Sequence, residues 1–250
     1  AEYLAARGSN DAFNQHRSRL IQFFQQAISD GYMETNIAEQ VIKRDKEARV
    51  RQRLTLEQYR AIFQQADFGI QSAMELSLNA QQRRADIQRW HRDWQQDGYA
   101  YVVQSKTWKH GPSAYLRLPL NMPCVHSERG CRTLQDLIGS CWWDAVSCPY
   151  LVHEKRPNMR KRNKDHRYQL TLKRISEGFA EARAATGLFD DWAEGECPTF
   201  HELLALGGHL FETRLGWSRK DIQALRGHTS ESTTEIYLEG HTWTTFKVPG

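Results

Sequence analysis

The segment from Thr199 to His241 constrains the fold more than any other part of this chain, because it predicts three short helices in succession. The first has Thr199 as its expected N-cap, with Glu202 completing a capping box. Its apolar residues recur at helical spacing: Phe200, Leu203, Leu206 and Leu210. The second runs from Ser218 to about residue 226 and is expected to stop at Gly227, and the third starts near residue 230. The pattern predicts a helical domain in which these stripes are buried.

Polar residues stand at fixed places around those stripes. They form three boxes, HELL at 201–204, LRGH at 225–228 and TTEIY at 233–237. Each is unremarkable alone, since a lone histidine at a helix start is usually exposed or capping and a tyrosine near a chain end usually packs in the core. Three boxes in this order and at these distances are far less expected by chance.

Two upstream stretches add to the pattern. NAQQRRADIQRW (79–90) begins a predicted helix and carries Arg83 and Asp86. Alternation through 99–104 and 115–118 predicts two antiparallel strands, with Pro119 ending the second and Lys106, in QSKT, at the hairpin tip. An isolated arginine or a hairpin lysine would ordinarily be a solvated surface residue.

Together these boxes resemble the tyrosine recombinases, the phage integrase family of the lambda type, over roughly residues 10 to 240. The family has an arginine box, a lysine at a hairpin tip, H-x-x-R, L-G-H and a nucleophilic tyrosine. The resemblance implies a catalytic set made of Arg83, Lys106, His201, His228 and Tyr237. One position departs from the pattern, because Leu204 stands where H-x-x-R has its arginine.

The resemblance also implies a mostly α (α+β) fold: a catalytic domain of helices with a small antiparallel β-sheet, preceded by a helical remnant of a core-binding domain. We expect the end of that domain over 1–42, a basic linker over 43–54, the catalytic domain over 55–240 and a tail over 241–250 that packs on a neighbouring protomer. The chain is expected to begin inside the core-binding domain and to lack the arm-site-binding module of some relatives, as a truncated or a naturally shortened form.

Other elements are predicted from capping and periodicity. Ser9 or Asn10 should cap a helix that stops at Gly31, and Thr55 with Gln58 forms a capping box. The expected helices cover 55–67, 69–78, 131–145 and 171–187, and the expected strands include 149–157 and 244–248.

Charge is mildly basic, with 34 Lys+Arg against 30 Asp+Glu, which permits nucleic-acid binding without arguing for it. Two basic runs, 43–53 and 153–167, say more. The first is either a solvated connector or, in a two-domain DNA clamp, a segment that follows phosphates. The candidate DNA-binding residues are Lys43, Arg44, Arg49, Arg51, Arg53, Arg84 and Lys109.

The five cysteines suggest a reducing compartment. Zinc is disfavoured, because six, nine and six residues separate Cys124, Cys131, Cys141 and Cys148 and no C-x2-C pair occurs. We expect no metal, no cofactor and no membrane span, since no apolar run approaches 18 residues. The resemblance implies double-stranded DNA and a homo-tetramer as partners, DNA-bending accessory proteins, and the bacterial host cytoplasm as the location.

The expected chemistry is metal-independent attack of the Tyr237 phenol on a DNA phosphate. Arg83 would clamp the phosphate oxygens, His201 and His228 would donate hydrogen bonds to them, and Lys106 would protonate the leaving 5′ oxygen. Leucine at 204 should cost roughly 10²–10³ in rate, the effect of losing one oriented donor, and Leu204→Arg should restore it. The alternatives are a catalytically silent relative that occupies core sites and an unrelated helical domain.

Overall fold

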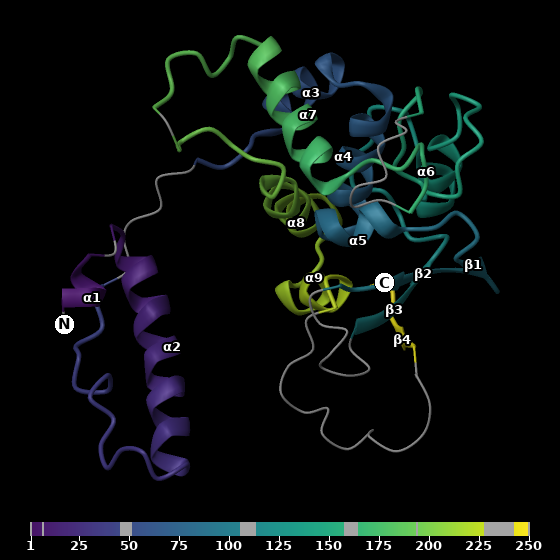
Figure 1. Ribbon diagram of the computed structural model, residues 1–250. Helices are drawn as coiled ribbons and strands as arrows, with labels where there is room; N and C mark the ends of the chain where they lie inside the picture. Colours follow the sequence, from purple (N-terminus) through teal and green to yellow (C-terminus); the bar gives the residue numbers. More distant parts are fainter. Residues whose placement is uncertain are drawn as a thin grey trace. The chain divides into compact units, whose positions relative to one another are not determined.

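The computed structural model describes residues 2–6, 8–45, 52–105, 114–157, 165–193, 195–227 and 243–249 (Figure 1). The chain divides into two compact units, Ala1–Val50 and Arg51–Gly250. The division falls within the stretch 43–54, which the sequence predicts as a linker. No helix in the described residues is long and apolar enough to cross a membrane.

The first unit consists of α1 (Glu2–Ala5), α2 (Asn10–Ser29) and the segment that follows them. Ser9 is the N-cap of α2, as predicted, and its hydroxyl accepts the backbone N–H of Ala12 at 3.1 Å. The later segment is attached to α2 by side chains, for example by Arg17, which donates to the carbonyl of Val41 at 2.5 Å. Burial in this unit is sparse.

The second unit is built around one helix that is buried on nearly every side. That helix, α4 (Phe68–Ala80), packs against α5, α6, α7 and α8, so it has no solvent-facing stripe. Asp67 caps it by accepting the N–H of Ile70 at 3.0 Å. The remaining helices are α3 (Leu56–Gln65), α5 (Arg84–Arg89), α6 (Leu134–Ser140), α7 (Leu172–Ala185), α8 (Glu202–Leu215) and α9 (Arg219–Leu225).

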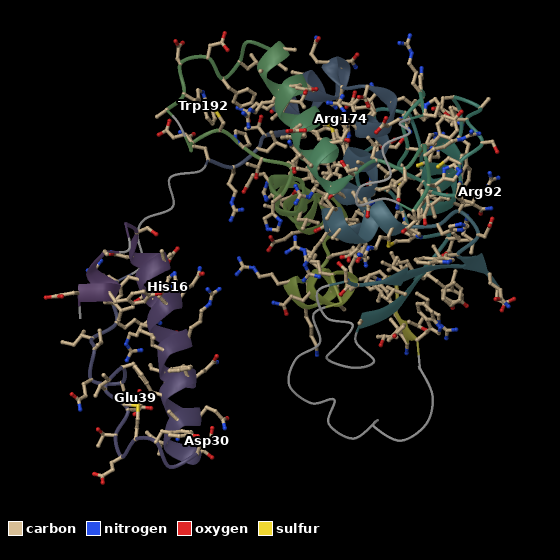
Figure 2. The ribbon with its side chains drawn as sticks, viewed as in Figure 1. His16, Asp30, Glu39, Arg92, Arg174 and Trp192 are labelled. Carbon is tan, nitrogen blue, oxygen red and sulfur yellow. The ribbon has the colours of Figure 1, made fainter. Side chains whose placement is uncertain are left out.

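The α3 and α7 helices are fixed by polar groups at their ends. Thr55 and Gln58 form the predicted capping box at the start of α3. Figure 2 shows Arg174 on α7, where its guanidinium contacts Glu181 at 2.5 Å and Asp67 at 2.9 Å. Because Asp67 is the N-cap of α4, this pair joins α7 to the start of the central helix.

A small sheet lies at one edge of the second unit (Figure 1). Within the described residues its order is β1 (Gln95–Gln96), β2 (Tyr99–Val103), β3 (Tyr115–Pro119) and β4 (Thr244–Thr245). The predicted β2–β3 hairpin is confirmed, and its inward residues are fully buried. The prediction of an antiparallel sheet is wrong, because β4 pairs with β3 in parallel and the sheet is therefore mixed.

Three predicted elements differ in extent or kind. The helix expected over 131–145 is shorter, because Thr133 is the N-cap of α6, in a capping box with Asp136, and the helix ends at Ser140. The strand expected over 149–157 is absent from its described residues, where only the isolated bridges of Tyr150 and His153 occur. Leu151 and Val152 are buried there without a partner strand. The tail strand expected over 244–248 is limited to Thr244–Thr245.

The described part of the tail packs on its own chain. Trp243 lies edge-on to Tyr101, with ring centroids 4.7 Å apart, and Phe246 is buried against Trp217 at 5.5 Å. Arg117 of β3 donates to the hydroxyl of Thr245. Exchange of this tail with a neighbouring protomer stays a prediction.

Candidate active site

The first part of the site is the turn between α4 and α5. Gln81 follows α4 in the left-handed conformation (φ 55°, ψ 26°), which is unfavourable for a residue with a Cβ. Its buried side chain donates to the carbonyl of Leu78 at 2.7 Å, which fixes the turn. Arg83 then becomes the N-cap of α5, so the helix predicted over 79–90 is interrupted at its start.

Arg83 lies on the wall of a cavity of about 750 Å³. The predicted site residues His201 and Leu204 line the same cavity, so the structure brings these three together. The other charged or imidazole groups on its wall are Arg53, His209, Glu212, Arg219 and Arg226. The single carboxylate among these lining residues, Glu212, pairs with Arg219 at 3.6 Å, and the wall is therefore strongly cationic.

A second hollow of about 450 Å³ shares Arg83, His201 and Leu204 with the first. Its wall adds two more guanidinium groups, those of Arg84 and Arg183. The three shared residues therefore stand where two cationic hollows meet. An extended polyanion matches such a surface better than a small neutral ligand does.

His201 stands at the start of α8, one residue before the first helical position. The predicted capping box of Thr199 and Glu202 is wrong, because His201 occupies the N-cap and makes no capping hydrogen bond with its side chain. Glu202 is 2% exposed and accepts a hydrogen bond from Arg53 at 3.2 Å. Its carboxylate therefore pairs with a residue at the start of the second unit. The imidazole of His201 is exposed at the cavity wall.

Two glutamines hold the carboxyl end of α9. Gln82 donates to the carbonyl of Leu225 at 2.9 Å, and Gln104 donates to the carbonyl of Arg226 at 2.8 Å. Gln104 also donates to the Gln82 side chain at 2.8 Å. Gly227 has φ +67°, and a Cβ on it would meet the Gln104 amide at 2.5 Å. The end of α9 is therefore attached both to the turn after α4 and to the end of β2.

Asp86 joins α5 to the same region. Its Oδ1 accepts the backbone N–H of Ser105 at 2.7 Å and the Ser105 hydroxyl at 2.8 Å. The described residues that follow β2 end at Ser105, and those that follow α9 end at Gly227. Gln104 joins these two ends through its hydrogen bond to the Arg226 carbonyl. The predicted residues Lys106 and His228 follow these positions directly in the sequence.

Arg226 is a cavity residue that the sequence analysis missed. Its Nη2 donates to the carbonyl of Leu204 at 2.5 Å, and its Nη2 and Nε donate to Oε1 of Gln81 at 2.7 and 3.0 Å. Burial, and then the nearby charges of Arg83 and Arg53, lower the pKa of Arg226. A charged residue inside the LRGH box, in a chain that lacks an arginine at 204, was the signal that could have revealed it.

Several predicted residues lie outside the described part of the chain: Lys106, His228 and Tyr237 of the catalytic set, and Arg49, Arg51 and Lys109 of the DNA-binding set. In the first unit Lys43 is exposed, whereas Arg44 stacks on the Phe13 ring with its Cζ 3.9 Å from the centroid. All five cysteines are free thiols. Among the described residues no cluster of three or more His, Cys, Asp or Glu could hold a metal.

Solved structures define the class of this fold. The crystal structure of a lambda integrase tetramer bound to a Holliday junction is similar with a TM-score of 0.71 and 29% identity, over 90% of this chain and 61% of that chain. The lambda integrase catalytic core is matched over its whole length and 79% of this chain, with a TM-score of 0.58 and 27% identity. The fold is that of an integrase catalytic domain.

Curated relatives show the same similarity in sequence. The integrase of Escherichia phage HK022 is 30% identical over 243 residues, covering 95% of this chain and 61% of the relative. That of Escherichia phage lambda is 30% identical over 234 residues, covering 91% and 58%. The chain thus spans about 60% of the length of these relatives. No family model matches the chain. Over most of its length the chain is therefore similar to phage integrases of the lambda type.

Proposed function

We propose that this chain is a site-specific DNA recombinase, which cuts and rejoins strands through a 3′-phosphotyrosyl intermediate. The observation that carries the proposal is the cationic cavity on which Arg83, His201 and Leu204 meet, although they come from the α4–α5 turn and from α8. Guanidinium and imidazole groups that outnumber the carboxylates on a cavity wall suit a phosphodiester. The integrase relatives support the same reading.

In this proposal each group has one task in the transfer. The Tyr237 oxygen forms a bond to phosphorus while the 5′ oxygen leaves and takes a proton from Lys106. Arg83 and His201 stabilise the charge on the non-bridging oxygens, and His228 is a candidate to donate there or to accept the phenol proton. The phosphotyrosyl ester stores the bond energy, so the second strand can reverse the step without ATP.

Assembly and partners follow from the same function. We propose double-stranded core-site DNA as the substrate and a homo-tetramer as the active form, because the similar lambda integrase structure is a tetramer bound to a Holliday junction. Accessory DNA-bending proteins remain part of the proposal. Arg53 and Arg84, on the walls of the two hollows, are the described cations best placed to contact phosphates beside the cleaved one.

One observation favours a second candidate function. Leucine at 204 cannot donate to a phosphate, and each oriented donor is worth roughly 10²–10³ in rate. A catalytically silent protein that occupies core sites would retain the cationic surface and lose only the cleavage step. The two functions differ in whether a covalent bond to DNA is formed.

A covalent-capture assay separates them. The 250-residue chain is incubated with a nicked duplex library whose core sequence is randomised, so that strand transfer releases a short oligonucleotide and traps the enzyme on DNA. Denaturant-resistant adducts that disappear in Tyr237→Phe are expected for a recombinase. Salt-sensitive mobility shifts without adducts would identify the silent binder, and adducts that persist in Tyr237→Phe would refute the assigned nucleophile.

A further inference from the structure

Glycines on α8 leave room for side chains from two other elements. A Cβ on Gly208 would lie 2.5 Å from Nη2 of Arg226, and a Cβ on Gly207 would lie 2.1 Å from Nε2 of Gln81. Glycine destabilises a helix interior relative to alanine. The space above this face of α8 is therefore kept free for the Arg226 guanidinium and the amide that holds it.

That space adjoins Leu204. Residues 204 and 208 are one helical turn apart and share a face of α8, which is also the face on which Arg226 donates to the Leu204 carbonyl. An arginine side chain at position 204 would start from this same face. The guanidinium of Arg226 therefore lies beside the position from which the H-x-x-R pattern supplies its own.

The Arg226 guanidinium is held through Nε and Nη2, and Nη2 donates both to Gln81 and to the carbonyl of Leu204. Gln81, which is 1% exposed, presents Oε1 to Nε and Nη2 because its own Nε2 is occupied by the Leu78 carbonyl. Within the described residues Nη1 of Arg226 makes no hydrogen bond and Arg226 forms no ion pair. A half-buried cation that neutral acceptors fix and no carboxylate compensates favours an anionic ligand.

The position of Arg226 also matches the rest of the cationic cavity. Arg226 and Arg83 line the same wall, and both guanidinium groups belong to residues that flank the turn of Gln81 and Gln82. Burial, and then the charges of Arg83 and Arg53, lower the pKa of Arg226, so the two guanidinium groups repel each other. A phosphate between them would relieve that repulsion, and Arg83 and the Nη1 group of Arg226 would both contribute charge-assisted hydrogen bonds.

We propose that Arg226 supplies the guanidinium that Leu204 lacks, so that the second arginine of the phosphate clamp comes from the end of α9 instead of from α8. The proposal rests on the recombinase function argued above. It makes this chain a rearranged form of the clamp, with Gln81 and Gly208 as the residues that position the displaced guanidinium.

The proposal changes what Leu204→Arg should do. With Arg226 in place, a new arginine at 204 would add another like charge beside Arg226, Arg83 and Arg53. We therefore expect little gain from Leu204→Arg alone, in contrast to the expectation from sequence. The gain should appear only when Arg226 is removed at the same time.

The test compares Arg226→Leu, Leu204→Arg and the double variant with the unchanged chain, in single-turnover covalent capture on the nicked duplex library at saturating protein. Arg226→Leu should lower the cleavage rate by about 10²–10³, and the double variant should recover most of that loss. Lys220→Leu, which also removes one charge from α9 but at an exposed residue that lines neither hollow, is the matched control and should keep its rate. Thermal unfolding of each variant reports on folding separately.

Substrate charge provides a readout that a merely structural role would not move. A sequence recovered from the library is resynthesised with a methylphosphonate in place of the scissile phosphate, which removes the charged oxygen. Arg226→Leu should then lose far less rate relative to the unchanged chain than it loses on the phosphate.

Each outcome decides the matter. Equal rates for Arg226→Leu and the unchanged chain overturn the proposal, as does an equal loss on both substrates with no recovery in the double variant. If the unchanged chain is inactive and the double variant is active, Arg226 does not replace the arginine, although the recombinase chemistry stands. If none of the proteins forms an adduct, the proposed function itself fails, and the role of Arg226 fails with it.

Discussion

The contact between α4 and α8 makes a sharp prediction about Gly207. A Cβ at this position would lie 2.2 Å from the carbonyl oxygen of Leu78 and 2.1 Å from the Gln81 amide nitrogen. The first neighbour is backbone of a fully buried helix and cannot turn away. Overpacking of this kind costs about 1–3 kcal/mol, against a helix-propensity gain of about 0.5–1 kcal/mol for Gly→Ala.

The net effect of Gly207→Ala should be a loss of about 1–2 kcal/mol, which corresponds to a fall in Tm of about 2–8 °C for a unit of this size. Gly139→Ala is the matched control, because Gly139 lies in α6 and a Cβ there would meet nothing within 4 Å. The control should be neutral or raise the Tm by up to about 4 °C.

Thermal unfolding followed by circular dichroism, with a urea titration at 25 °C, measures both variants. The opposite signs of the two substitutions are what the geometry requires. If Gly207→Ala proves as stable as Gly139→Ala, the close approach of α8 to the end of α4 is wrong. The cavity that depends on this approach would then have to be redrawn.

Two further predictions concern buried carboxylates. Asp86→Ala removes both hydrogen bonds to Ser105, one of them to backbone, and should lower the free energy of unfolding by about 2–4 kcal/mol. Ser105→Ala removes only the hydroxyl bond and should lower it by about 1 kcal/mol. Equal losses for the two variants in a urea titration would contradict this assignment. Burial raises the pKa of Glu75, so the stability that its proton contributes is complete below the unfolded pKa of about 4.3 and is lost as the pH rises through the higher folded pKa. Glu75→Gln cannot titrate, so its stability relative to the unchanged chain should increase across that window, and parallel stability–pH curves would show that Glu75 is not the group responsible.

Local signals in the sequence predicted the elements whose ends are determined by neighbouring residues. Thr55 with Gln58 and Ser9 at α2 act as caps because their partners are three residues away in the chain. The Thr199–Glu202 prediction failed because Arg53, far away in the sequence, competes for the same carboxylate. The direction of β4 depends on where the chain returns to the sheet, which no local pattern encodes.

The site was predicted unevenly for a related reason. Arg83, His201 and Leu204 were recognised because they fall at positions of a known pattern, and the structure places them on one wall. The roles of Arg226 and Gln81 could not be predicted from local sequence, because they depend on a hydrogen bond between residues 145 positions apart. The glycine pair at 207–208 indicates that another element approaches α8 closely, but the sequence does not show which group that is.

The glutamines at positions 81, 82 and 104 have a consequence for the field inside the cavity. They tie α9 to the rest of the domain through amide groups, which fix geometry and carry no net charge. Ionised carboxylates could not replace these amides, because they have no N–H to donate to the carbonyls of Leu78, Leu225 and Arg226. Their charge would also cancel the positive potential that an incoming polyanion experiences. Mechanical connection and electrostatic strength are thus kept independent, because the amides that anchor α9 add no negative charge to the cavity wall.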